Sequence, residues 1–300
     1  MSTDAYFDVW ECRGSRSSAP GRSRIGSYTS CYSLHRGEDL FVFDAGRGLA
    51  SLADATFEDP RLAQVTRIHV LISHAHLDHW EGLKDASWFW TPKNGRAVTI
   101  YGTSEALATI VLGLAPPAFV PLEVLALGTV ETLAWVTVKA GDKVEIGRDS
   151  FEALHLNHYS GLKGSRRDLD TVGFRVALRD GPSVSYLSDH EPVPETQGME
   201  DAAAHGSALM VMDCQFADVI DHAFGHGSQE HAAGCARRHP RTLILAAHHG
   251  PRTDDQIEEA RERHGAGLEN FALAIEGQGL LWDVGLDRFV ACGRAGVSRP

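Results

Sequence analysis

Cysteine is scarce in this chain and widely scattered. Only 5 of the 300 residues are cysteines, and none of them forms a C-x-x-C pair. An odd, scattered set argues against a disulfide framework and against a zinc site built from thiolates. We therefore expect a protein of a reducing compartment, the cytoplasm.

Long apolar runs are also missing. No window approaches the roughly 18 apolar residues that a membrane-spanning helix needs. The opening stretch MSTDAYFDVW has no basic segment followed by an apolar one, so it lacks the pattern of a signal peptide. We expect no membrane partner.

The chain also lacks an excess of positive charge. Lys and Arg number 28 against 40 Asp and Glu, which gives a formal net charge of −12. Duplex binding depends on Lys and Arg that neutralise phosphates, so broad nucleic-acid binding is excluded. A small phosphate ester stays compatible, because bound divalent cations would offset the negative charge locally.

What the chain does have is a series of short apolar or β-branched runs separated by Gly, Pro and Asp, which predict strands. They lie at Asp39–Phe43, Arg67–Ser73, Ala97–Tyr101, Ala134–Val138, Phe151–Leu156, Val172–Leu178, Ser183–Ser188, Leu209–Met212 and Thr242–Ala247. Helices are predicted at 104–113, 228–239 and 253–264, the second with Ser228 as N-cap and the third with a capping box. The pattern predicts a mixed α/β fold in one domain over residues 1–300.

Histidine is abundant, with 16 residues, and its densest cluster follows a predicted strand as His74-Ala-His76-Leu-Asp78-His79. In extended backbone, residues two apart point to the same side, so the His74 and His76 side chains can bind one metal ion together. Asp78 and His79 turn into the next element and can face a second point nearby. Four ligand-type side chains so close together predict two adjacent divalent metals, and zinc and manganese both accept imidazole with carboxylate.

This cluster resembles the signature of the metallo-β-lactamase superfamily, and the resemblance extends over nearly the whole chain. It favours the phosphodiesterase-type members, such as phosphoribosyl cyclic phosphodiesterases and tRNase Z. The further matching segments are Trp10–Ser15, Thr29–Cys31, Asp44–Gly46, Leu156–His158, Tyr186–Asp189, Phe224–Ser228 and Leu243–Pro251. The resemblance implies an αβ/βα sandwich of four layers, with two mixed sheets and outer helices.

The resemblance also implies a ligand set for two divalent ions, Zn or Mn. One ion would be held by His74, His76 and His158, the other by Asp78, His79 and His248, with Asp189 bridging them. Two positions stay open: His155 lies three residues before His158, and His249 follows His248 directly, so either neighbour could replace the residue chosen. Histidines without motif support, such as His190, are expected at the surface.

The implied reaction is hydrolysis of a small or cyclic phosphodiester by a hydroxide that bridges the two metals. Asp78 would orient this nucleophile, and His226 in its Gly-flanked loop is the candidate general acid. Arg13 and Arg167 are candidate substrate contacts, with Arg16, Lys163 and Arg166 also in loops.

The expected partner is a small-molecule phosphodiester, and a homodimer is left open. Two other functions remain: a lactonase or another hydrolase of this fold, and a non-catalytic metal-binding regulatory protein. A tRNA nuclease would need a basic arm, but residues 102–133 contain no Lys or Arg. The polar insertion 161–170, and Gly250 where the family pattern H-H-D-P has Asp, leave the substrate itself undetermined.

Overall fold

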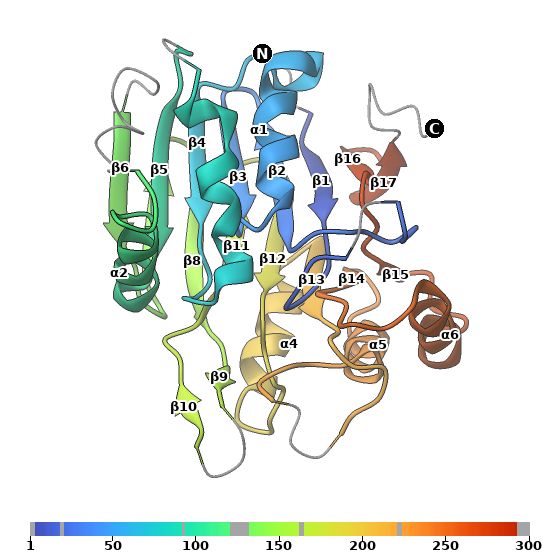
Figure 1. Cartoon of the computed structure of the whole chain (residues 1–300). Helices are drawn as coiled ribbons and strands as arrows, with labels where there is room; N and C mark the ends of the chain where they lie inside the picture. The colour runs from blue at the N-terminus through green and yellow to red at the C-terminus, as the bar shows by residue number, and fades with distance from the viewer. Residues whose placement is uncertain are drawn as a thin grey trace.

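The apolar runs of the chain pair into two large mixed sheets that face each other (Figure 1). The computed structural model describes residues 4–18, 21–91, 94–120, 132–161, 165–220 and 224–292. The first sheet has eight strands, in the order β17 (Arg288–Cys292), β16 (Gly279–Asp283), β1 (Tyr6–Glu11), β2 (Cys31–Arg36), β3 (Asp39–Phe43), β4 (Arg67–Leu71), β5 (Ala97–Gly102) and β6 (Thr132–Thr137).

The second sheet has seven strands. Their order is β15 (Phe271–Leu273), β14 (Leu243–Ala247), β13 (Leu209–Asp213), β12 (Ser183–Leu187), β11 (Val172–Ala177), β8 (Asp149–His155) and β7 (Lys143–Ile146). A small hairpin of β9 (Tyr159–Ser160) and β10 (Arg167–Asp168) extends below the sheets in Figure 1. The predicted insertion 161–170 therefore contributes one strand of a hairpin.

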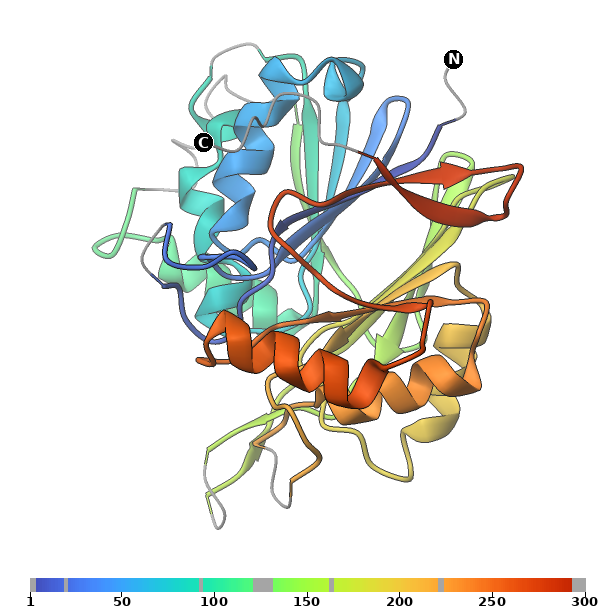
Figure 2. The same cartoon turned by 90° about the vertical axis from the view of Figure 1, so that its right-hand side faces the viewer.

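Helices cover the outer face of each sheet, as Figure 2 shows from the side. Helices α1 (Gly48–Glu58) and α2 (Ser104–Gly113) lie on the first sheet. Helices α4 (Gln197–His205), α5 (Gln229–Arg238) and α6 (Asp254–Gly265) lie on the second. The predicted four-layer αβ/βα sandwich is confirmed.

Strand β3 shows why its sequence is apolar at nearly every position. Phe41 and Phe43 point into the core between the sheets, whereas Leu40 and Val42 pack beneath α1. Successive side chains of a strand alternate between its two faces. A strand covered on both faces therefore needs a continuous apolar run instead of an alternating one.

The predicted helix starts are confirmed where a capping side chain marks them. The Ser228 hydroxyl accepts a hydrogen bond from the His231 amide, and Thr253 and Gln256 form a capping box. Helix α1 is not among the predicted helices, and its start carries no such signal because Arg47 makes no capping hydrogen bond. None of the helices in the described ranges has the length and hydropathy that a membrane crossing requires.

The ends of six strands converge on one edge of the sandwich. In the first sheet β3 and β4 run parallel, and in the second β12, β13 and β14 do. Strand β8 has the same direction as β12, because each is antiparallel to β11. Open α/β sheets bind ligands outside the carboxyl ends of their strands, so this edge is where a site is expected.

The core between the sheets offers a direct test of the packing. Phe174 is 0% exposed and packs against Phe151, with ring centroids 5.8 Å apart. We expect Phe174→Ala to lower the free energy of unfolding by about 3–5 kcal/mol, because it leaves a cavity. The control Leu112→Ala, at a side chain 75% exposed, should change it by about 0.5 kcal/mol or less. Urea unfolding measures both; equal effects would contradict the packing.

Candidate metal centre

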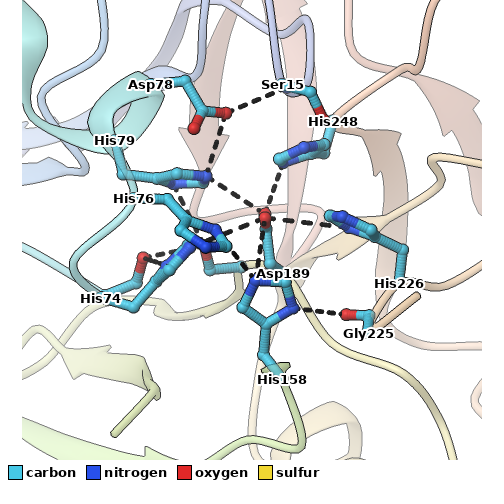
Figure 3. Close-up of polar contacts among 12 residues, drawn as sticks. Ser15, His74, His76, Asp78, His79, His158, Asp189, Gly225, His226 and His248 are labelled. Carbon is cyan, nitrogen blue, oxygen red and sulfur yellow. Dashed lines mark hydrogen bonds and ion pairs between the residues drawn. The ribbon is translucent and has the colours of Figure 1, made fainter. Parts of the chain in front are cut away.

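The segment after β4 leaves the sheet at Ser73. The backbone amide of Ser73 bonds to a side chain and not to a neighbouring strand. The Ser73 amide donates to Asp44 Oδ1 over 2.8 Å. From there His74 and His76 turn to the same side, and a short 3-10 turn over Leu77–His79 presents Asp78 and His79. The H-x-H-x-D-H spacing thus brings all four ligand-type side chains to one place (Figure 3).

One group of candidate ligands combines three histidines with a carboxylate. It consists of His74, His76, His158 and Asp189, whose ligand atoms all lie within 4.8 Å of one another. His158 follows the end of β8 and Asp189 the end of β12. His76 Nδ1 lies 3.2 Å from His158 Nε2, so these two rings face a common point.

A second group consists of Asp78, His79 and His248, again with ligand atoms within 4.8 Å of one another. His248 follows β14 with a φ of 50°, in the left-handed region that a histidine seldom adopts. The Ser15 amide donates to Asp78 Oδ2 over 2.9 Å and so holds the loop after β1 over this group.

The carboxylate of Asp189 lies between the two groups, at the centre of Figure 3. Its Oδ2 is 3.7 Å from His74 Nε2 and 3.7 Å from His158 Nε2. Its Oδ1 is 3.3 Å from His79 Nε2 and 2.5 Å from His248 Nδ1. Each carboxylate oxygen therefore faces one group, which is the arrangement of a bridging ligand.

Partners outside the cluster fix which nitrogen each ring turns inward. His74 Nδ1 bonds to the Ser73 hydroxyl, His79 Nδ1 to Asp44, and His158 Nδ1 donates to the Gly225 carbonyl. In all three rings Nε2 is left facing Asp189. Metal-ligating histidines bond in this way through the nitrogen that does not bind the metal.

Several buried atoms of the cluster face one another without the geometry of a normal hydrogen bond among the described residues. They are His74 Nε2, His79 Nε2, Asp189 Oδ1 and His248 Nδ1. A buried polar atom without a partner is costly. Imidazole nitrogens and carboxylate oxygens are the donors that zinc and manganese accept, so the residues fit divalent cations.

The charges in the cluster shift its titrations strongly. Burial by itself would lower the pKa of His79, but Asp189, Asp78 and Asp44 raise it well above its usual range. Burial opposes the ionised form of Asp189, yet His248 and His79 hold its pKa well below its usual range. The carboxylates therefore stay ionised and available as ligands.

His226 lies at the rim of this cluster with a partner that the sequence did not reveal. Its Nδ1 is 2.9 Å from Asp213 Oδ2 and 3.7 Å from Asp189 Oδ2. Burial would lower the pKa of His226, but Asp213 and then Asp189 raise it to about 9. Asp213 ends the apolar strand β13, the same signal that marks Asp44 after β3, so a search of every strand end would have found it.

The alternatives left open at two positions differ clearly in the structure. His155 is exposed at the end of β8, outside the cluster that contains His158. His249 is buried but belongs to neither group of candidate ligands, and burial lowers its pKa to about 3. His190, expected at the surface, is instead buried, with its Nε2 3.1 Å from Glu200 Oε1.

The two candidate substrate arginines are both held by carboxylates. Arg13 is buried and pairs with Asp254 at 2.6 Å, so it anchors the loop after β1 to α6. Arg167 on β10 is exposed and pairs with Glu105 of α2. Lys163 lies outside the described residues.

Comparison with known proteins agrees with this geometry. A family model described as "Beta-lactamase superfamily domain" matches residues 40–249. No curated protein sequence matches the chain. Among solved structures, the metallo-beta-lactamase fold protein YhfI from Bacillus subtilis is 16% identical with a TM-score of 0.64, covering 93% of this chain and 99% of its own.

Two further structures share the fold over comparable lengths. A diphosphatase from the PhnP family is 15% identical with a TM-score of 0.62, covering 94% of this chain and 98% of its own. Zn²⁺-bound PqqB from Methylobacterium extorquens is 14% identical with a TM-score of 0.64, covering 93% of this chain and 100% of its own. Similarity at these identities establishes the sandwich fold.

Gly14 allows the loop after β1 to lie directly on the cluster. A Cβ atom at this position would lie 1.7 Å from His248 Cδ2, so Gly14→Ala must displace the ring or the loop. We expect this variant to lose metal affinity about 10-fold or more while it stays folded. Metal titration and thermal unfolding would measure the two effects.

The matched control is Gly234→Ala in α5, where the nearest heavy atom outside the local helix backbone would be 3.8 Å from the new Cβ. It should bind metal as the parent does and be stabilised by up to about 1 kcal/mol. Unchanged metal affinity in Gly14→Ala would contradict the close contact between this loop and His248.

Proposed function

Because the chain belongs to the beta-lactamase superfamily domain family, we propose that it is a binuclear metal-dependent hydrolase. The proposed reaction is hydrolysis of a small or cyclic phosphodiester. The observation that carries this proposal is the Asp189 carboxylate, with one oxygen toward His74 and His158 and the other toward His79 and His248.

In this proposal His74, His76 and His158 hold one cation, and Asp78, His79 and His248 hold the other. Asp189 is shared between them, which uses both of its oxygens. Divalent cations bound there would supply Lewis-acid charge and lower the pKa of a water toward neutrality. Zinc and manganese both suit this donor set, and the Zn²⁺-bound PqqB fold relative supports zinc.

The chain's own residues would prepare the attack. Asp78 is fixed by the Ser15 amide through Oδ2 and has its side chain 15% exposed, so it can meet both the second cation and an entering water. The Asp78 pKa is lowered, because His79 outweighs the effect of burial. As a permanent acceptor it can orient a nucleophile by hydrogen bonding.

His226 would supply the proton that the leaving alkoxide needs. The Asp213 carboxylate beside Nδ1 raises the pKa of His226 and so favours the protonated imidazole that a general acid requires. The Asp213 carboxylate holds Nδ1, so Nε2 is the nitrogen left for donation. The side chain is 11% exposed and can therefore contact a bound ligand.

Phosphodiester chemistry is favoured over a lactone or β-lactam by the environment of the site. The loop after β1 that covers Asp78 carries the exposed Arg16, and the PhnP-family fold relative is described as a diphosphatase. A lactonase would share the metal ligands. Comparing turnover of a lactone, a β-lactam and cyclic and linear phosphodiesters separates these functions.

Metal content and turnover test the proposal together. We expect the purified protein to carry about two zinc or manganese ions per chain and to hydrolyse bis-p-nitrophenyl phosphate. His76→Ala and Asp78→Ala, each removing a ligand, should lower this turnover by about 100-fold or more with the fold retained. Elemental analysis, circular dichroism and absorbance assays give the three readouts.

The matched control is His155→Ala, which removes an exposed histidine at the end of the same strand β8 that leads to His158. It should keep both the metal content and the turnover of the parent. A protein without metal that stays inactive after metal is restored would end the hydrolase proposal. Full activity in both ligand variants would contradict the ligand assignment.

Substrates with different leaving groups test whether His226 is the proton donor. His226→Ala should slow hydrolysis of an alkyl phosphodiester by about 100-fold, but that of a p-nitrophenyl ester far less, because p-nitrophenolate leaves without a proton. Activity that needs protonated His226 falls as pH rises through its pKa. Asp213→Asn removes the carboxylate that raises this pKa, so the fall should move to lower pH. Equal losses for both esters would exclude His226 as the acid.

A further inference from the structure

The loop that covers the metal ligands also borders a cavity of about 330 Å³. Gly14 packs on His248 and the Ser15 amide bonds to Asp78, while Arg13 and Arg16 on either side of them line the cavity. The rest of the wall comes from residues further along the same loop, between Ser17 and Arg24, and from the residues that precede and open α6. The cavity therefore begins one residue away from a backbone group that contacts the candidate metal centre.

The lining of this cavity is rich in positive charge. It contains five arginines and two aspartates, although the chain as a whole is strongly acidic. The arginines are Arg13, Arg16, Arg22, Arg24 and Arg252. Such a local excess attracts an anion into a concave site.

The two aspartates already pair with arginines of the same lining. Asp254 pairs with Arg13 at 2.6 Å, and its other oxygen accepts from the Arg24 amide. Asp255 pairs with the Arg24 guanidinium at 3.0 Å. In the described part of the chain, Arg16, Arg22 and Arg252 make no ion pair, so three positive charges have no carboxylate in direct contact.

Of these three arginines, Arg252 has the most buried surroundings. It is partly buried, and its guanidinium donates to the Cys214 carbonyl at 2.7 Å, with Gln229 Oε1 at 3.5 Å. Its Nε is buried and has no hydrogen-bond partner among the described residues, and neither does the Ser17 hydroxyl in the same lining. The direct hydrogen-bond partners of Arg252 are thus neutral, and the more distant charges of Asp218 and Asp213 favour its charged form. A partly buried cation in this position is stabilised by an anion in direct contact.

A second charged cavity, at the opposite ends of the strands, shows the contrast. It measures about 560 Å³ and is lined by four arginines and four acidic residues. Arg36 pairs there with Asp149, Arg67 with Asp39, and Arg148 with Asp180. Because its charges balance, this cavity calls for no ligand and provides a matched control.

We propose that the cavity lined by Arg16, Arg22 and Arg252 is an anion site that binds a phosphate-type dianion. Arginine is suited to this because its planar fork donates two parallel hydrogen bonds to phosphate oxygens. The dianion is either a second phosphate of the substrate held at the metals, an assignment that rests on the proposed function, or a separate phosphate ligand. Both sources share the same recognition chemistry.

The first experiment measures binding of inorganic phosphate to the full metal-loaded chain by calorimetry. The double variant Arg16→Gln/Arg22→Gln alters exposed side chains and should weaken a phosphate-binding step by about 10-fold or more. The control Arg148→Gln/Arg179→Gln changes the same number of charges in the balanced cavity and should leave that step as in the parent. Identical affinities in all three proteins would overturn the anion site.

The second experiment identifies the source of the dianion. It compares KM for thymidine 3′-(p-nitrophenyl phosphate) with and without a 5′-phosphate. If the substrate supplies the dianion, the 5′-phosphate lowers KM about 10-fold, and the ratio returns to about one in Arg16→Gln/Arg22→Gln. An equal KM for the two esters, with arginine-dependent binding of inorganic phosphate, assigns the cavity to a separate ligand.

The two proposals fail in different ways. No turnover of either ester by the metal-loaded parent, with arginine-dependent phosphate binding, would contradict the hydrolase proposal and support the anion site. Turnover of both esters, with phosphate binding unaffected by the arginine substitutions, would support the hydrolase proposal and contradict the anion site.

Discussion

The candidate centre depends on one buried carboxylate, that of Asp189. The residue is 2% exposed, yet its charge is held among imidazoles from three different strand ends. A buried charge is tolerated only where opposite charge or hydrogen bonds surround it on every side. The convergence of the strand ends at this edge supplies those partners, and it also makes them the ligands that divalent cations use.

A second carboxylate, Asp44, fixes the geometry around the first. It accepts from the Ser73 amide and hydroxyl at 2.8 Å, from Tyr186 at 2.6 Å, and bonds to His79 at 2.7 Å. Tyr186 belongs to β12, whereas Asp44 follows β3, so this one group ties the two sheets together directly beneath the cluster. The positions of His79 and Asp189 are therefore set by the packing of the sandwich itself.

Much of this could be predicted from the sequence, because burial on both faces forces apolar strands and the polar residues at their ends stand out. The segment His74–His79 is recognisable in this way from the sequence alone. The choice between His248 and His249 is not, since it depends on the positive φ of His248. The position of Asp213 at a strand end is visible in the sequence, but its pairing with His226 is not, and the expectation of a surface position for His190 is wrong. In both cases a histidine in a loop pairs with a buried carboxylate of another segment, and such a pairing leaves no local pattern in the sequence.

Anomalous X-ray diffraction from crystals grown with zinc or manganese would show whether Asp189 divides the cluster into two cation sites. We expect two anomalous peaks, one on each side of the Asp189 carboxylate, with metal–nitrogen distances of about 2.0–2.1 Å for zinc. One peak should lie among His74, His76 and His158 and the other among Asp78, His79 and His248. A single peak, or metal bound elsewhere with none at Asp189, would exclude a binuclear centre bridged by Asp189.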